Sequence, residues 1–174
     1  MKFRKHIRLK EYDYSASNYY FVTVCTNYRK KLFVPRVSGK YGNLLPKNVV
    51  AASYAAKNTD VVIRTLQRLE EDYYDNFEVD FYCVMSDHIH AIFAFHDQIK
   101  RKGAIRSRNY KLSDIITAFK SLVTRQIGSK IFQPSFYEHV IRSDSSLERI
   151  RNYILHNPFV AYVEIPWKKL DPNT

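Results

Sequence analysis

The sequence predicts an α+β fold, an antiparallel sheet of the ferredoxin-like (split βαβ) type with helices on one face and an added C-terminal helix. The expected elements run strand, helix, strand, strand, helix, strand, helix, which is a split βαβ unit followed by one extra helix. The 174 residues are 45% hydrophobic with only four glycines and six prolines, which suits one domain with a sizeable core. We therefore expect a single domain over 1–174, with a basic leading arm at 1–18 and a tail at 159–174.

The first half of the chain begins with a strand and continues into a helix. Residues 19–26 are aromatic and β-branched, which is typical of a strand. Residues 27–46 are rich in Lys, Arg, Gly and Pro, and predict a basic loop with room for a short hairpin. From 47 to about 73 the apolar residues recur at helical spacing, although Asn58-Thr59-Asp60 leaves one helix or two open.

The middle of the chain predicts a hairpin. Strands are expected at 77–86 and 88–95, with Ser86-Asp87 as the tight turn between them. Residues 97–110 surround a glycine with lysines and arginines, and predict a second basic loop.

The last part predicts a helix, a strand and a final helix. The first helix spans 112–127 with Ser113 as its N-cap, and a fourth strand covers 136–142. Several capping residues at 143–148 begin the final helix, which runs to Asn157 before a proline stops it.

The charge and aromatic content favour a nucleic-acid partner. The formal net charge is +11, and aromatic residues make up 15% of the chain. Basic residues attract phosphates and aromatic rings stack on unpaired bases, so the combination suits single-stranded nucleic acid. Eight basic residues are candidates for phosphate contacts: Arg29, Lys30, Lys31, Lys100, Arg101, Lys102, Lys120 and Arg125.

Composition also bears on redox state and location. Cys25 and Cys83 lie in apolar runs without Cys-x-x-Cys spacing, so buried, reduced thiols are expected rather than zinc ligands. No targeting segment and no apolar stretch of membrane-spanning length is visible, so we expect a cytoplasmic protein with no membrane partner.

Two short segments carry the chemistry. His88 and His90 are two apart on an expected strand, so both imidazoles can face one cation. Tyr153 and Asn157 are four apart on an expected helix and share one face. If these faces meet, a metal with nitrogen and oxygen ligands lies beside a phenol, which suits phosphodiester cleavage by covalent tyrosine catalysis.

With the two histidines and the tyrosine–asparagine pair in this order, the sequence resembles a known family. The matching segments are 83–90 (CVMSDHIH), 119–121 (FKS), 136–142 (FYEHVIR) and 150–158 (IRNYILHNP). They resemble the single-tyrosine HUH transposases of bacterial insertion sequences, and within these the REP-associated tyrosine transposases. The resemblance implies an RRM-like sheet whose added C-terminal helix carries the tyrosine.

The resemblance also implies roles and partners. His88, His90 and Asn157 would bind a divalent metal, Mg²⁺ or Mn²⁺, and Tyr153 would attack a DNA phosphate. The products would be a 5′-phosphotyrosine and a free 3′-OH, and a second 3′-OH would reverse the bond without any nucleotide cofactor. The expected substrate is single-stranded DNA with a hairpin, bound by a monomer or a homodimer.

Several alternatives stay open at this point. The family usually has Pro-Asn before the first histidine, where this chain has Ser86-Asp87, so Asp87 is a turn residue, which we favour, or a partner of the metal site. His139 and His156 are general-base candidates by proximity in sequence only. A replication initiator or relaxase would use the same chemistry, and a non-catalytic module would bind single-stranded nucleic acid without cutting it.

Overall fold

The computed structural model describes residues 11–39, 54–104 and 108–157. These residues form a sheet with strand order β2-β3-β4-β1-β5, in which all neighbours are antiparallel. The strands are β1 (Asn18–Cys25), β2 (Arg36–Gly39), β3 (Tyr74–Val84), β4 (His88–Arg101) and β5 (Tyr137–Ile141). The helices are α1 (Tyr54–Arg68), α2 (Leu112–Ile127) and α3 (Asp144–His156), with short helical turns η1 (Asn27–Arg29) and η2 (Leu69–Tyr73).

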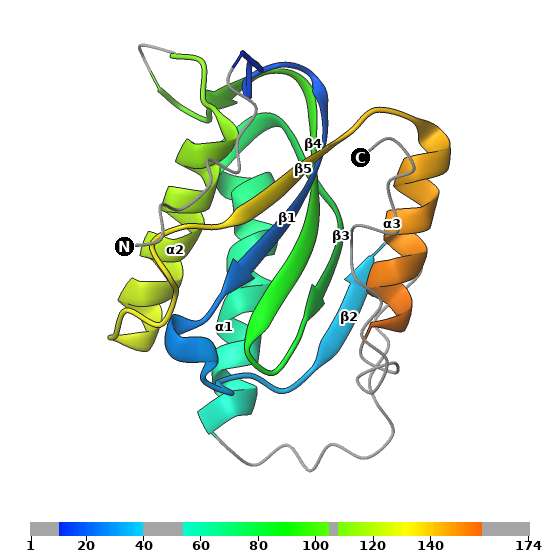
Figure 1. Ribbon diagram of the computed structural model, residues 1–174. Coiled ribbons are helices and arrows are strands. Elements are labelled where there is room, and N and C mark those ends of the chain that lie inside the picture. The colour runs from blue at the N-terminus through cyan, green and yellow to red at the C-terminus, as the bar shows by residue number, and fades with distance from the viewer. Residues whose placement is uncertain (1–10, 40–53, 105–107, 158–174) are drawn as a thin grey trace, which may run out of the picture.

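The predicted α+β architecture is confirmed. Helices α1 and α2 lie together on one face of the sheet, and α3 covers part of the other face (Figure 1). Successive strand residues point to opposite faces, so neighbours in β1 enter different cores. Tyr20 and Val22 pack toward α1 and α2, whereas Phe21 packs with Ile150 and Ile154 of α3.

The predicted loops were wrong in two places. Residues 36–39, inside the expected loop 27–46, form edge strand β2, which pairs with β3. Strand β4 continues to Arg101, so the basic loop expected at 97–110 begins later than predicted. The polar run before Ile99 concealed this extension, because there the hairpin projects beyond the core and only Ile99 is buried.

Asn58-Thr59-Asp60 does not interrupt α1. The buried Thr59 hydroxyl donates to the Val34 carbonyl (3.1 Å) and accepts from the Val34 N–H (2.8 Å), while Asn58 donates to the Leu32 carbonyl (3.2 Å). These polar side chains therefore fasten the helix to the segment before β2. The part of the predicted helix at 47–53 lies outside the described residues.

The start of α2 also differs from the prediction. Ser113 lies inside the helix, and the cap comes from Asp114, whose carboxylate accepts a hydrogen bond from the Lys111 N–H (3.0 Å). The helix ends as expected at Gly128, which has φ 82°.

Part of the leading arm is docked on the fold. Tyr12 and Tyr14 pack against Tyr20, and the Leu112 N–H donates to the Tyr14 carbonyl (3.1 Å). Residues 1–10 of the arm and the tail at 159–174 lie outside the described residues. Within the described ranges, every helix is too short or too polar to cross a membrane.

An irregularity in β3 turns a charged side chain toward α3. Val79 and Phe81 pair with adjacent residues of β4, which makes Asp80 an extra residue in its strand, a β-bulge. Because of this one-residue shift, Val79 packs toward α1 and α2 whereas Phe81 packs toward α3.

The bulged residue anchors the last helix. The Asp80 side chain is 1% exposed and accepts two hydrogen bonds from Arg151 of α3, from Nε (2.8 Å) and from Nη2 (2.6 Å). Bidentate pairing of this kind fixes orientation as well as distance. The pair therefore sets how α3 sits on the sheet.

Removing the guanidinium should destabilise the protein. Arg151→Met should lower the free energy of unfolding by about 3 kcal/mol or more, because the Asp80 carboxylate would stay buried without this partner. A thermal melt should show Tm falling by about 6–12 °C. The exposed Arg149 on the same helix is the matched control, and Arg149→Met should cost below about 0.5 kcal/mol. Equal losses in the two variants would contradict the anchoring role of Asp80.

Candidate active site

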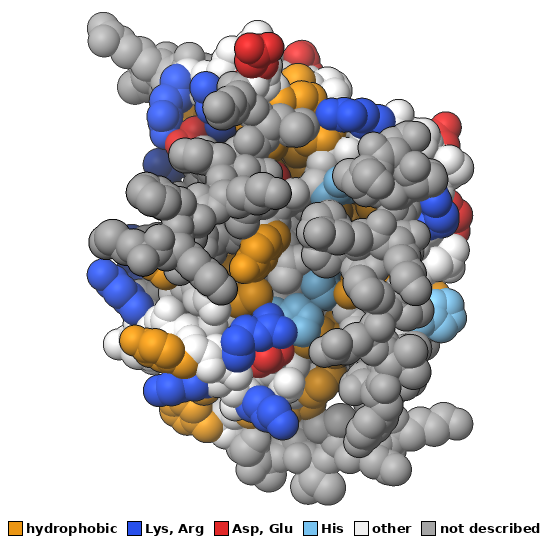
Figure 2. Space-filling view, in the orientation of Figure 1, with side chains coloured by type: hydrophobic (Ala, Val, Ile, Leu, Met, Phe, Trp, Pro, Cys, Tyr) orange, Lys and Arg blue, Asp and Glu red, His pale blue; other side chains and the backbone are white. Residues whose placement is uncertain are grey.

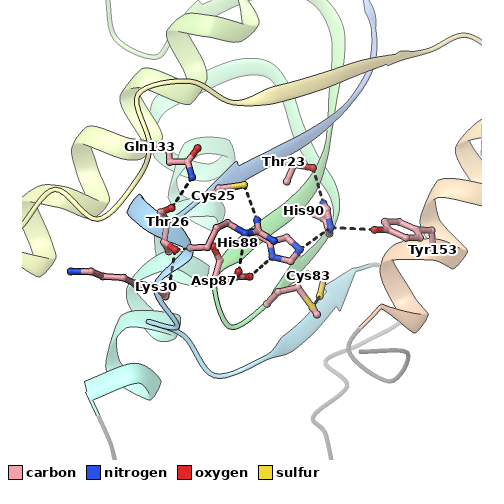
Figure 3. Close-up of polar contacts among 12 residues, drawn as sticks. Thr23, Cys25, Thr26, Lys30, Cys83, Asp87, His88, His90, Gln133 and Tyr153 are labelled. Atoms are coloured by element: carbon pink, nitrogen blue, oxygen red, sulfur yellow. Dashed lines mark hydrogen bonds and ion pairs between the residues drawn. The ribbon is translucent and has the colours of Figure 1, made fainter. Parts of the chain in front are cut away.

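The two histidines lie side by side at the start of β4. His88 follows the turn after β3, and His90, two residues on, points to the same face of the sheet, the face that carries α3. Their Nε2 atoms are 3.1 Å apart (Figure 3). Near the centre of the view in Figure 2, histidine side chains reach the surface beside basic and acidic side chains. The predicted pairing of the two imidazoles is thus present in the fold.

Each ring is held through its other nitrogen. His88 Nδ1 lies 2.6 Å from Asp87 Oδ1, and His90 Nδ1 lies 2.8 Å from the Thr23 hydroxyl of β1. A carboxylate only accepts, so neutral His88 carries its proton on Nδ1 and leaves the Nε2 lone pair free. If His90 likewise donates to Thr23, both lone pairs face one point. Asp87 is thus both the turn residue we favoured and a partner of His88.

Burial keeps both imidazoles neutral. Desolvation lowers the pKa of His88, and the hydrogen bond and charge of Asp87 oppose this shift only in part. The pKa of His90 is lowered well below its ordinary value, first by burial and then by the neighbouring His88 and Arg29. Neutral imidazole is the form that binds metals, so both rings are ready ligands at neutral pH.

Helix α3 brings the tyrosine to the histidines. The Ser143 hydroxyl caps the helix by accepting from the Ser146 N–H (3.2 Å), and Ile150 and Ile154 bury one side of the helix. Tyr153 adjoins that buried side, and its hydroxyl lies 3.5 Å from His90 Nε2 (Figure 3). Its ring also meets the ring of Phe21 at 6.2 Å, edge to face.

Two opposing effects act on the phenol. Burial raises the pKa of Tyr153, whereas hydrogen bonding from Asn157, one turn later, lowers it and so favours the phenolate. The tyrosine and the amide therefore meet at one spot, as their spacing of four residues predicts.

The donor set fits a divalent cation. Two ligands with bonds of about 2.1 Å at right angles are about 3 Å apart, close to the separation of the two Nε2 atoms. The described residues contain no cluster of three His, Cys, Asp or Glu side chains suited to a metal. The Asn157 side chain, which lies at the Tyr153 phenol, offers an amide oxygen of the kind that divalent cations bind.

A basic turn lies beside the histidines. Arg29 Nε pairs with Asp87 Oδ2 (2.9 Å), and Lys30 and Lys31 are exposed on the same segment. Tyr28 and Arg29 both have φ 55°, a conformation that costs a non-glycine residue energy. This strained turn directs an arginine at the acidic partner of His88.

The other candidate basic residues are dispersed. Lys100, Arg101 and Lys102 lie at the far end of the β3–β4 hairpin, about 35 Å along an extended strand from His90. The Lys102 ammonium donates to the carbonyls of Glu70 (3.0 Å) and Glu71 (2.7 Å).

The remaining two basic candidates lie on α2, across the sheet from the histidines. The Lys120 ammonium donates to the carbonyls of Gln133, Pro134 and Ser135 at 2.8–3.2 Å. Arg125 is exposed. The fold therefore places Arg29 beside the histidines, with Lys30 and Lys31 exposed on the same segment, and places the other five elsewhere.

The two general-base candidates occupy different places. His156 is exposed and its Nδ1 bonds the Asn152 carbonyl (2.7 Å). His139 lies opposite Phe21 in the β1–β5 pairing, on the face that carries the histidine pair.

The sequence did not identify Thr23, which hydrogen-bonds His90, or Phe21, whose ring contacts the rings of both His90 and Tyr153. Phe21 stacks on His90 with ring centroids 5.2 Å apart. These contacts depend on which residues of β1 and β4 lie opposite each other. The sequence of either strand alone does not determine that register.

Both cysteines are buried and free, as predicted. Cys25 accepts a hydrogen bond from Arg29 Nη1 (3.0 Å), and burial raises the pKa of the Cys83 thiol.

Comparison with known proteins places this geometry in a family. A protein of Haemophilus influenzae described as uncharacterized is 24% identical over 173 residues, which covers 90% of this chain and 89% of that protein. A solved structure described as the REP-associated tyrosine transposase bound to a REP hairpin superposes with a TM-score of 0.59 and 20% identity. The superposition covers 89% of this chain and 74% of that one, and shows a shared fold. Residues 14–157 match the family described as "Transposase IS200 like", so the chain belongs to the IS200-like transposases.

Proposed function

We propose that this transposase cleaves and rejoins single-stranded DNA through a covalent 5′-phosphotyrosine on Tyr153. The observation that carries the proposal is the position of the Tyr153 hydroxyl, 3.5 Å from Nε2 of His90 and beside the paired imidazoles. A phenol and two neutral metal-binding nitrogens at one point on a surface are the groups that phosphodiester cleavage by tyrosine requires.

The protein's own residues supply the nucleophile and its position. The Tyr153 phenol gives up its proton as its oxygen attacks the phosphorus, the bond to the 3′-oxygen breaks, and that oxygen takes a proton to become a free 3′-OH. Attack by another 3′-OH on the phosphotyrosine reverses these bonds and regenerates the phenol, so no nucleotide cofactor is consumed. Asn157 favours the phenolate, while the packing of α3 fixes the direction of attack.

We further propose a divalent metal, Mg²⁺ or Mn²⁺, held by His88, His90 and Asn157. When bound, it neutralises charge on the phosphate oxygens as a Lewis acid. Asp87 and Thr23 orient the two imidazoles toward it, and Arg29 adds a positive charge beside them. Such supporting partners typically change metal affinity 10–100-fold when removed.

The proposed substrate is DNA with a single-stranded part and a hairpin. The net charge of +11 and the exposed Lys30 and Lys31 beside the site support a polyanionic partner. The similar solved structure is bound to a REP hairpin, which supports a hairpin substrate here. Because its substrate is DNA, we expect this bacterial-type transposase to act in the cytoplasm without a membrane partner.

We propose that a monomer is sufficient for strand cleavage. The Tyr153 hydroxyl approaches His90 of its own chain, so one protein molecule holds both halves of the site. This supports cleavage in cis, whether or not the protein also forms a homodimer.

Tyr153→Phe should abolish covalent product while leaving DNA affinity within about twofold, because only the nucleophilic oxygen is removed. The measurement is a denaturing gel of labelled hairpin-bearing single-stranded DNA incubated with Mn²⁺ or Mg²⁺. The partly buried Tyr19 on the same face is the matched control, and Tyr19→Phe should still form the adduct. An adduct with Tyr153→Phe would rule out Tyr153 as nucleophile, whereas binding without an adduct in the wild type would favour the non-catalytic module.

Replacing both histidines by alanine should abolish cleavage and metal binding without unfolding the protein. The expected result is loss of Mn²⁺ binding in calorimetry together with loss of the adduct on the gel. His96→Ala, on the exposed far part of the same strand, is the control and should keep both. Full cleavage by wild-type protein in EDTA would count against the metal.

A mixing experiment tests cleavage in cis. Tyr153→Phe lacks the nucleophile, and the double histidine variant lacks the metal ligands, so each is inactive alone. If each site is built from one chain, an equimolar mixture stays inactive on the adduct gel. Recovery of adduct on mixing would show that the tyrosine acts on a partner's histidines.

A further inference from the structure

We propose that Tyr137 is a stacking platform for an unpaired DNA base next to the scissile phosphate. This inference rests on the proposed function and names a binding subsite of the same site. Tyr137 opens β5, which is an edge strand of the sheet, and its side chain is 51% exposed. The sheet's other described aromatic residues are buried or partly buried. The exposure of this one ring is therefore not explained by packing in the core.

The register of the sheet puts Tyr137 in line with the site. Tyr137 pairs with Thr23 of β1, and Thr23 pairs with His90 of β4. Directly opposed residues point to the same face, so the three side chains form one row across three strands. Two strand spacings separate Tyr137 from His90, about 10 Å, which is close to the reach of one or two nucleotides from a phosphate at His90.

Helix α3 leaves this part of the face open. It packs mainly on β2, β3 and β4 and reaches β1 at Phe21, with Tyr153 at the histidines, whereas Tyr137 lies beyond β1 on the opposite side of the row. A DNA strand with its phosphate at Tyr153 and His90 can therefore continue across Thr23 and lay a base on the Tyr137 ring.

The platform is held rigidly in place. Immediately before β5, three carbonyls accept from the Lys120 ammonium, which anchors the chain to α2. Gln133 donates through its side chain to the Thr26 carbonyl (3.1 Å) and through its backbone to the Cys25 carbonyl (2.9 Å) (Figure 3). Thr26 in turn donates to the Asp87 carbonyl, so the approach to Tyr137 is tied to the turn that carries His88. A preorganised ring loses little entropy when a base stacks on it.

The chemistry fits an unpaired base of any identity. Every base has a π-face, and stacking on an aromatic side chain tolerates sequence while requiring that the base be free of its pairing partner. Tyr137 would thus favour a single-stranded segment beside the cleavage point over a continuous duplex.

The test uses variants in the Tyr153→Phe background, so that binding is measured without cleavage. The probe is a DNA hairpin with a single-stranded extension of randomised sequence, followed by fluorescence anisotropy. Tyr137→Leu keeps apolar bulk but loses the ring, and should weaken binding about fivefold or more, whereas Tyr137→Phe should bind as well as the parent. Tyr54→Leu is the matched control, since Tyr54 is 69% exposed on α1, across the sheet, and should leave binding unchanged.

A second arm locates the base. Abasic sites are placed singly along the extension, and one position should weaken binding to the parent but not to Tyr137→Leu, because the lost base and the lost ring are the same contact. Equal binding by Tyr137→Leu and Tyr54→Leu, or abasic penalties identical in both proteins at every position, would overturn the inference. Adduct formation by the wild type is measured separately. If Tyr137 contributes to binding but the wild type forms no adduct, the proposed function is refuted and the stacking role of Tyr137 stands. If the wild type cleaves DNA but Tyr137→Leu binds DNA as well as the parent, only the stacking role of Tyr137 is refuted.

Discussion

The bidentate pair between Asp80 and Arg151 is the contact on which the geometry of the site depends. Tyr153 lies two residues after Arg151 on α3, and the histidines lie on β4, the strand next to Asp80. The buried carboxylate accepts from a guanidinium in a fixed orientation, so the pair limits both the rotation and the sliding of α3. The bulge that turns Asp80 toward α3 is therefore part of the active-site architecture, although it lies outside the site itself.

A second set of contacts joins the loops at the same end of the sheet. The carbonyl of Asp87 accepts from Thr26, and its carboxylate lies between His88 and Arg29. Asn27 bonds back to the carbonyls of Lys130 and Ile131, which fixes the strained turn at η1 against the chain before β5. The imidazoles are thus oriented by neighbours that are themselves held, which suits the metal site that we propose.

The features of the site that depend on residues close together in the sequence could be predicted. The spacing of two from His88 to His90 and of four from Tyr153 to Asn157 fixes which side chains share a face, and the structure bears this out. The order of strands and helices likewise identified the split βαβ sheet. Strand β2 escaped prediction because it is short and lies between basic and glycine-rich residues, and its pairing with β3 is decided by the rest of the sheet.

Features that depend on register or on a bulge could not be found in the sequence. Thr23 and Tyr137 join His90 only through pairing across three strands, and Asp80 reaches Arg151 only through a one-residue shift. The eight basic residues looked equivalent in the sequence, yet the fold places three beside the histidines and uses the ammonium groups of Lys102 and Lys120 to bind carbonyls. We propose that Tyr153, which α3 holds beside the histidine pair, is the residue that becomes joined to DNA. The most direct test of this proposal is to digest the DNA–protein adduct and locate the nucleotide-bearing residue by mass spectrometry. We expect DNA joined through a 5′-phosphate to Tyr153 alone, and attachment at any other residue would show that Tyr153 is not the nucleophile.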